Sequence, residues 1–395
     1  MLHYSTFMTF PWRFWVGGSC FLAALFAVLH APAYPFWFVA LGVTEWGYWM
    51  IPLALAPLWP SGLNTPKDRL GRRLGAAAAF LLLSPLLRAW PVARALPQQF
   101  AAAFPSAPLP SGIGLSARPA PLVWEDLFWG VSTPALRPKT LVYSVVGKQV
   151  LSLDLYRKDT LSVPAPGVIV VHGGSWTSGH RTELSTLSQY LAARGYVVAA
   201  VDYRFSPQYP FPSACQDVQA AIQYLKVRAK DFGLDSTQLV ILGRSAGGQI
   251  ALSVAYTSND PAIRGAIAFY SPLDLVWGYA RPGNPLILNS RRILSEYIGG
   301  TPDRVAGAFD AASPVNFIDA HTPPTLVIHG QRDELVWPHH SDVLSERLAK
   351  AGRPFVYLKL PWATHGCDAH FSGPCGQLTT YAVERFLAAV TSAKF

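Results

Sequence analysis

Short apolar runs alternate with longer amphipathic segments through the last two thirds of the chain. This alternation constrains the fold more than any other feature of the sequence. The runs are Gly167–Val171, Tyr196–Val201, Leu239–Leu242, Gly265–Tyr270, Thr325–Ile328 and Phe355–Leu360. The amphipathic segments include Glu183–Arg194, Asp217–Lys230, Ser341–Ala351 and Leu378–Val390. Buried strands separated by helices are typical of a mostly parallel sheet with helices on both faces. We therefore predict an α/β fold, with functional side chains at the carboxyl ends of its strands.

A stretch rich in Ala, Pro and Ser separates this region from the first quarter of the chain. Residues 96–121 carry almost no charge and no lasting period, so we expect an extended linker. After it, the alternating segments Leu141–Val146 and Val150–Tyr156 flank Gly147-Lys148 and predict a β-hairpin. We therefore assign residues 122–395 to one domain and residues 1–95 to a separate unit.

The unit formed by residues 1–95 contains three long apolar stretches. They cover Phe14–His30, Pro35–Trp59 and Leu74–Trp90, with tryptophans near or inside their ends. A helix needs about 20 apolar residues to cross a bilayer, and tryptophan gathers at the membrane–water interface. We therefore predict a membrane anchor of about three transmembrane helices. For the first stretch, a cleaved signal peptide that ends at Ala33 is an alternative.

The charges of the same unit predict its orientation. Lys67, Arg69, Arg72 and Arg73 follow the second stretch, and such positive loops tend to stay in the cytoplasm. The third helix would then carry the chain outward, which puts the α/β domain on the periplasmic or extracytoplasmic side. Glu45 interrupts the second stretch. An acidic residue there is either a functional site, or is protonated or bonded to a neighbouring helix, and we favour the second explanation.

The composition argues against nucleic-acid and metal partners. The net charge is +9, but Lys and Arg are scattered and form no basic stripe, so we expect no nucleic-acid partner. Four cysteines are too few for a disulfide scaffold in a chain of 395 residues. Cys367 and Cys375 lie close together but lack the spacing of a zinc site, so we expect no metal and leave a local disulfide open.

The sequence Gly243-Arg244-Ser245-Ala246-Gly247-Gly248 follows the run Leu239–Leu242 and precedes a helical segment. Gly-x-Ser-x-Gly between a strand and a helix raises the serine on a sharp turn, where a base can reach its hydroxyl. The glycines remove side chains that would collide in that turn. Ser245 is therefore the candidate nucleophile.

A serine nucleophile requires a base, and the base requires an acid that orients it. After such a turn, the acid precedes the histidine along the chain. Asp333 comes shortly after the run Thr325–Ile328, with Glu334 as the competing acid, and His365 follows the run Phe355–Leu360. We favour Asp333 as the acid and His365 as the base, because each member then follows a different strand.

A serine nucleophile of this kind also needs N–H donors for the oxyanion that develops on the substrate. The run Gly167–Val171 leads into His172-Gly173-Gly174-Ser175-Trp176. The backbone N–H groups of this turn, together with that of Ala246, could supply the donors, while His172 is expected to brace the turn. We expect structural roles for the other candidate residues, with Asp202 paired to Arg204, His329 in the core, and His339 and His340 capping a helix.

Together these motifs resemble the esterase/lipase branch of the α/β-hydrolases. That branch includes acetyl and feruloyl esterases, hormone-sensitive-lipase-like enzymes and kynurenine formamidase. The resemblance covers about Leu141 to the C-terminus. It implies that the nucleophile is Ser245, the acid Asp333, the base His365, and the oxyanion donors Gly173, Gly174 and Ala246.

The sequence departs from this family at two positions. Ser175 stands where the lipase-like turn usually has a third glycine, which could shift the donor set by one residue. Arg244 stands where many relatives have an acidic or small residue, which changes the charge beside the nucleophile. The resemblance also implies a small cap from Ser271 to Thr322. Its aromatic residues serve either as pocket walls or as packing: Trp277, Tyr279, Tyr297, Phe309 and Phe317.

We therefore expect a membrane-anchored serine carboxylic ester hydrolase that acts through an acyl-enzyme on small or short-acyl esters. No metal or organic cofactor is expected, and the oligomeric state is left open. Amide or peptide cleavage, or acyl transfer, on the same triad is one alternative. A catalytically inactive, membrane-tethered binding module is another.

Overall fold

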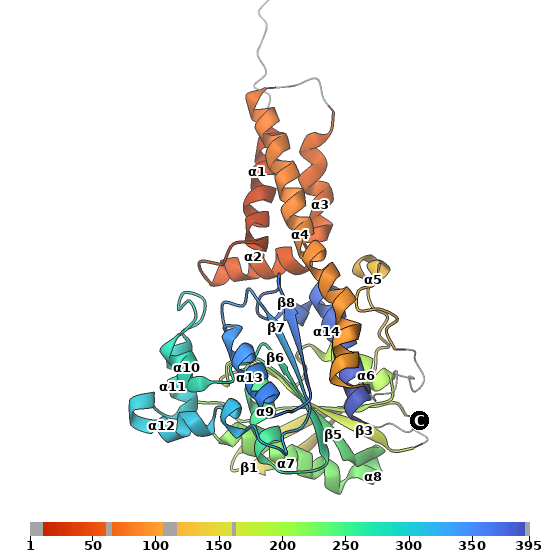
Figure 1. Ribbon diagram of the computed structural model, residues 1–395, viewed down its shortest axis with the longest axis vertical. Helices are drawn as coiled ribbons and strands as arrows, with labels where there is room; N and C mark the ends of the chain where they lie inside the picture. The colour runs from red at the N-terminus through yellow and green to blue at the C-terminus, as the bar shows by residue number, and fades with distance from the viewer. Residues whose placement is uncertain (1–10, 61–64, 106–116, 160–162, 392–395) are drawn as a thin grey trace, which may run out of the picture.

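The computed structural model describes residues 11–60, 65–105, 117–159 and 163–391 (Figure 1). These residues form a mixed sheet covered by helices, and a group of helices from the N-terminal part of the chain projects from one end of it. Residues 61–64 and residues 106–116 of the predicted linker lie outside the described part. The positive residues Lys67, Arg69, Arg72 and Arg73, predicted in a loop, lie in the helix Pro66–Ala103.

The sheet of the described residues has eight strands and is mostly parallel, as predicted. Its spatial order is β1-β2-β4-β3-β5-β6-β7-β8, and only the first two pairings are antiparallel. All six predicted runs and the predicted hairpin are confirmed as strands. The strands are β1 (Lys139–Val146), β2 (Gln149–Tyr156), β3 (Ala165–Val171), β4 (Val197–Val201), β5 (Leu234–Arg244), β6 (Ile263–Phe269), β7 (Thr325–Gly330) and β8 (Phe355–Leu360).

Helices cover both faces of the sheet because its central strands are apolar on both sides. In β3, Ile169 and Val171 belong to one core cluster, while Val168 and Val170 belong to the other. The first cluster is completed by α7 (Ser213–Val227), α8 (Ala229–Phe232), α9 (Ala246–Thr257) and α13 (His339–Lys350). The second is completed by α6 (Ser185–Ala193), α14 (Pro374–Val390) and the last part of α4 (Pro66–Ala103).

The segment predicted as a cap lies between β6 and β7. It contains α10 (Leu275–Ala280), α11 (Ser290–Ile298), α12 (Pro302–Ala311) and the short turn η3 (Pro314–Phe317). Two of its aromatics pack inward. Tyr297 stacks on Trp176 with ring centroids 4.2 Å apart, and Phe309 is fully buried against Tyr279.

The N-terminal part differs from the prediction of about three transmembrane helices. Among the described residues, α4 is the one helix long and apolar enough to cross a membrane by itself. The first stretch forms α1 (Trp12–Ala24) and η1 (Leu25–Ala27), which together are short. The second bends by 84° between α2 (Tyr34–Glu45) and α3 (Gly47–Leu55), with η2 (Ala56–Leu58) after it. As Figure 1 shows, α1, α3 and α4 project away from the sheet, while α2 lies across their base.

The helix α4 joins the two parts of the chain. Its 38 residues make it about 57 Å long, roughly twice the thickness of a hydrocarbon core. Leu96 and Phe100 are buried in the core cluster on the sheet. Residues 96–103 are therefore helical, not extended as predicted, because they bury an apolar stripe against the sheet.

The described end of the linker is also fixed to the sheet domain. Arg118 is buried, donates to the side-chain oxygen of Gln377 (2.7 Å) and forms an ion pair with Asp126 (2.9 Å). Its backbone N–H donates to Glu384 on α14 (3.1 Å). After this contact the chain continues through α5 (Trp124–Trp129) to β1.

The Glu384 carboxylate supports a first prediction. It is buried and also receives the Arg194 guanidinium (2.7 Å) and the Tyr190 hydroxyl (2.9 Å). Glu384→Ala should lower the free energy of unfolding by about 3 kcal/mol, because it leaves a largely buried cation and two donors without their acceptor. Asp231→Ala is the control, since Asp231 forms an exposed ion pair with Arg228. Equal effects of the two variants in urea unfolding would contradict this account.

Candidate active site

Ser245 occupies a sharp turn between β5 and α9. Its backbone has φ 52° and ψ −123°, an unusual conformation for a residue with a side chain. The turn forces close backbone contacts. A Cβ on Gly243 would collide with the carbonyl of Gly247, and a Cβ on Gly247 would collide with the carbonyls of Val171 and His172. Glycine at both positions is therefore a steric requirement, and the turn presents Ser245 at the carboxyl end of the sheet.

The structure brings Ser245, Asp333 and His365 together from three strand ends. His365 Nε2 lies 3.0 Å from Ser245 Oγ, and His365 Nδ1 lies 2.6 Å from Asp333 Oδ2. With its proton on Nδ1, the imidazole donates to Asp333, and Nε2 is free to accept the proton of the serine hydroxyl. Glu334, the competing acid, instead accepts from the N–H of Ala31 (2.8 Å).

Asp333 is fully buried and still ionised, because hydrogen bonds surround it. Its Oδ1 accepts from the N–H groups of Leu335 (3.0 Å) and Val336 (2.9 Å). Its Oδ2 lies 3.3 Å from His329 Nε2. Burial opposes ionisation, but the nearby His365 and His329 outweigh it and lower the pKa of Asp333 to about 2. His329, expected from the sequence in the core, is indeed buried, but its contact with Asp333 was not predicted.

The turn after β3 lies directly beside the nucleophile. A Cβ built on Gly173 would lie 3.4 Å from the Cβ of Ser245. Within the part of the chain that the structure describes, no group accepts from the backbone N–H of Gly173, Gly174 or Ala246. The N–H groups predicted to bind an oxyanion therefore have no internal acceptor among the described residues. That of Ala246 directly follows Ser245, and those of Gly173 and Gly174 lie in the turn beside it.

The carbonyl side of the same turn is held by aromatic residues. The Tyr203 hydroxyl donates to the carbonyls of His172 and Gly173 (both 3.1 Å), and the His172 ring stacks on Tyr203 with centroids 4.4 Å apart. Burial lowers the pKa of His172 to about 4, so this ring stays neutral near pH 7. These contacts match the bracing role expected of His172.

A pocket next to Ser245 opens toward the segment predicted as a cap. Its volume is about 520 Å³, including the part open to solvent. Apolar side chains from the cap and from the Asp333 loop dominate its walls, among them Leu275, Leu288, Ile293, Leu294, Val336 and Trp337. None of the five aromatics named from the sequence of the cap lines this pocket. Tyr297 and Phe309 are buried in the core, Trp277 stacks on His339, and Phe317 is exposed. The pocket suits an apolar group attached to a carbonyl carbon held at Ser245.

The comparisons with known proteins agree with this geometry. A protein-family model described as BD-FAE matches residues 153–348. The probable carboxylic ester hydrolase LipM of Mycobacterium tuberculosis is 29% identical over 90% of this chain and 86% of its own length. Esterase LipC of the same organism is 34% identical over 60% of this chain and 61% of its own length.

Together these matches support an α/β-hydrolase of the esterase/lipase family.

Solved structures show the same fold. An esterase from Thermogutta terrifontis, Est2, aligns with a TM-score of 0.51 at 25% identity, covering 64% of this chain and 90% of its own. A hyperthermophilic esterase from Pyrobaculum calidifontis aligns with a TM-score of 0.57 at 22% identity, covering 66% and 88%. The match to LipM covers more of the chain than the hydrolase domain contains, so the similarity extends into the N-terminal helices.

Two residues beside the triad of this hydrolase were not predicted as a pair. Arg244, noted above as a departure from the family pattern, is buried and forms an ion pair with Asp368 (2.6 Å). Tyr270 donates its hydroxyl to the same carboxylate (2.5 Å), and its ring packs on His365 with centroids 4.5 Å apart. The extra positive charge is therefore neutralised inside the protein. The presence of Arg244 in the turn was the only sign of this pair in the sequence. Its partner, Asp368, lies 124 positions further along the chain.

Three other polar residues have partners that differ from those expected. Asp202 pairs with Arg181 (2.5 Å) and not with Arg204, which pairs with Asp217 (2.8 Å). His340 does not cap a helix with its side chain, since its Nδ1 accepts from the N–H of Asp274 (3.2 Å) in the cap. In each case a residue from another element approaches more closely than the neighbour in sequence.

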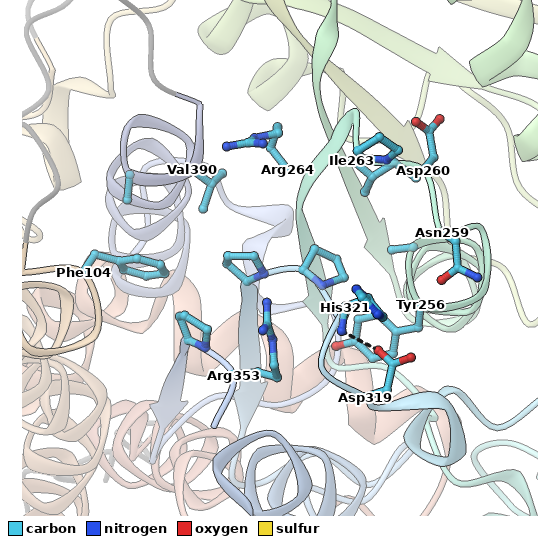
Figure 2. Close-up of a pocket in the computed structure, with 16 residues that line it drawn as sticks. Phe104, Tyr256, Asn259, Asp260, Ile263, Arg264, Asp319, His321, Arg353 and Val390 are labelled. Carbon is cyan, nitrogen blue, oxygen red and sulfur yellow. Dashed lines mark hydrogen bonds between the residues drawn. The ribbon is translucent and has the colours of Figure 1, made fainter. Parts of the chain in front are cut away.

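A wider hollow lies at the amino ends of the strands, away from Ser245 (Figure 2). It is lined by Ile263, at the amino end of β6, and by polar side chains that include Arg264, Asp319, His321 and Arg353. The triad lies at the carboxyl ends of the strands. This hollow is therefore separate from the candidate active site.

The low pKa of Asp333 predicts how stability depends on pH. The folded state holds this pKa near 2, below the ordinary value of about 3.9, so folding favours the ionised form. The resulting stability is complete above about pH 5 and is lost as the pH falls toward 2. Asp333→Asn lacks this contribution. The difference in unfolding free energy between wild type and Asp333→Asn should therefore shrink, by on the order of 2 kcal/mol, between pH 5 and pH 2. A constant difference in urea titrations across this range would contradict the prediction.

Proposed function

We propose that this hydrolase acts through a covalent acyl-enzyme formed on Ser245, on small or short-acyl esters, from a membrane-anchored position. Its class, a carboxylic ester hydrolase, follows from the family. The observation that carries the mechanism is the chain of two hydrogen bonds, 3.0 Å from Ser245 to His365 and 2.6 Å from His365 to Asp333.

The proposed reaction uses these atoms in two steps. Ser245 Oγ attacks the ester carbonyl while His365 Nε2 accepts its proton, and the N–H groups of Gly173, Gly174 and Ala246 receive the oxyanion. His365 then gives the proton to the leaving alcohol. A water molecule then attacks the acyl-enzyme while His365 Nε2 accepts its proton, and His365 returns this proton to Ser245 Oγ as the acid leaves. Asp333 stays ionised throughout and stabilises the imidazolium form of His365.

The pocket supports the proposed substrate size. Its 520 Å³ include open space, and the segment between β6 and β7 closes one side with apolar side chains. The enclosed space within these walls is about 50 Å³, which favours a short acyl or alcohol group. We keep amide or peptide cleavage and acyl transfer as alternatives on the same triad. The names of the relatives favour esters. An inactive binding module fits less well, because the triad and the oxyanion donors are all present.

Membrane anchoring is supported by the surface of the N-terminal helices. Large apolar side chains are exposed along them, including Trp15 (54%), Leu22 (65%), Trp59 (76%) and Phe80 (65%). Exposed apolar surface of this extent is typical of contact with lipid or with another protein. We propose that the first part of α4 enters the bilayer together with α1 and α3, as the anchor assigned to residues 1–95.

We further propose that the catalytic domain lies on the extracytoplasmic side. Besides the positive residues Lys67, Arg69, Arg72 and Arg73, the support is a disulfide between Cys367 and Cys375. Disulfides persist in oxidising compartments and are rare in the cytosol.

Removing the nucleophile tests the mechanism. Ser245→Ala should reduce turnover of p-nitrophenyl acetate and butyrate by about 10⁴-fold or more, because the acyl-enzyme cannot form. It should also abolish labelling by a fluorophosphonate probe. Ser258→Ala, at the far end of the same helix α9, is the matched control and should keep both properties. Wild-type turnover in Ser245→Ala would rule out the assignment.

Protease accessibility tests the orientation. In spheroplasts that express the chain, external protease should digest the domain after residue 117 and leave a cytoplasmic marker intact. Inside-out vesicles should protect the domain. The opposite pattern would place the domain in the cytoplasm.

A further inference from the structure

We infer that the N-terminal helical segment positions the catalytic loops, and that Glu45 is the residue through which it holds the loop of His365. This inference rests on the proposed function of the triad. It gives the segment a role in the reaction in addition to anchoring.

Glu45 is the last residue of α2 and is completely buried. Its carboxylate reaches into the sheet domain. Oε1 accepts from the indole N–H of Trp362 (3.2 Å), and Oε2 accepts from the backbone N–H of Cys375 (3.1 Å). From the sequence, Glu45 was expected to be protonated or bonded to a neighbouring helix. The partners lie instead in the hydrolase domain, more than 300 positions along the chain.

The two partners lie at either end of the connection between β8 and α14 that carries His365. Trp362 is fully buried three residues before His365. Cys375 is the second residue of α14, so the carboxylate meets the positive end of a 17-residue helix. The disulfide from Cys375 to Cys367 brings the chain back to two residues after His365. Glu45 therefore fixes the loop on both sides of the base.

Aromatic contacts strengthen the same attachment. Trp46 stacks on His370 with ring centroids 4.4 Å apart, and the Tyr48 hydroxyl lies 3.0 Å from His370 Nε2. The same hydroxyl donates to the carbonyl of Leu127 (2.8 Å). The break between α2 and α3 thus packs directly on the loop of the base.

A second set of contacts holds the loop of Asp333. On one side of this acid, the Arg332 guanidinium donates to the carbonyls of Phe26 (3.0 Å) and Leu29. On the other side, Glu334 accepts from the N–H of Ala31 (2.8 Å). The residues flanking Asp333 are therefore both tied to the chain between α1 and α2. The acid and the base are held by one segment, which sets their separation.

The same segment also contacts the rim of the pocket. The N–H of Tyr34 donates to the carbonyl of Leu286 (3.2 Å), and the Asn284 side chain donates to the carbonyl of Pro32 (2.9 Å). The neighbouring Gly283 and Leu288 line the pocket. Displacing the N-terminal helices would thus move the acid, the base and a pocket wall together.

The test uses full-length protein in detergent micelles, with Glu45→Leu, Glu45→Gln and the control Thr44→Val. Thr44 is equally buried, but its hydroxyl donates only within α2, to the carbonyls of Ala40 and Leu41. We measure kcat per site titrated with a fluorophosphonate, KM for p-nitrophenyl butyrate, and hydrogen exchange of peptides covering residues 362–375.

Glu45→Leu should lower kcat per titrated site by about 10- to 100-fold with little change in KM, since a misplaced base slows chemistry more than binding. Exchange at residues 362–375 should increase. Glu45→Gln should recover part of kcat because its amide oxygen can still accept one of the two bonds. Thr44→Val should match wild type in both measurements.

Each other outcome has a definite meaning. If Glu45→Leu matches Thr44→Val in kcat and exchange, the inference is overturned while the proposed function stands. If Glu45→Leu does not fold, Glu45→Gln decides, and wild-type kcat and exchange in that variant would overturn the inference. If the wild type neither turns over esters nor reacts with the probe, the proposed function fails, and the exchange data alone decide whether Glu45 holds the loop.

Discussion

The close packing of two backbone turns at the centre of the sheet determines the geometry of this hydrolase. The strands β3 and β5 are parallel neighbours, so the turn after β3 and the turn that carries Ser245 lie against each other. Gly247 contacts the carbonyls of Val171 and His172 so closely that no side chain fits. This contact puts the unused N–H groups of Gly173 and Gly174 in the turn beside the nucleophile. The packing of these two turns thus determines the position of the candidate oxyanion donors relative to the nucleophile.

The buried charged residues around Ser245 are paired, and these pairs orient the base His365. Asp333 remains ionised because two backbone N–H groups and two imidazoles surround it, which compensates for the loss of water. Arg244 and Asp368 neutralise each other, and Tyr270 connects Asp368 to the face of His365. His365 is therefore restrained through its nitrogens and through its ring, as a base that must act on one hydroxyl requires.

The N-terminal helices form one structural unit with the hydrolase domain. The helix α4 runs from the projecting helices onto the sheet without a break, and Leu96 and Phe100 continue the domain core. Glu45 and the chain around Ala31 reach the two loops of the triad from the same side. The loops of the acid and of the base are thus joined to these helices through buried contacts.

Much of the fold and of the candidate site could be predicted from the sequence, because those features depend on local patterns. Apolar runs bounded by turns identify the strands, and the order of Ser245, Asp333 and His365 follows from the positions of strand ends. Tertiary structure alone decided the partners of Glu45, Arg244 and Asp202, because hydrogen bonds depend on which distant elements approach each other. The shape of the N-terminal part was decided in the same way. Its apolar stretches have the composition of membrane-spanning helices. However, α4 extends beyond its apolar stretch because its last part is buried against the sheet. The second stretch breaks directly after Glu45, whose carboxylate bonds to the hydrolase domain.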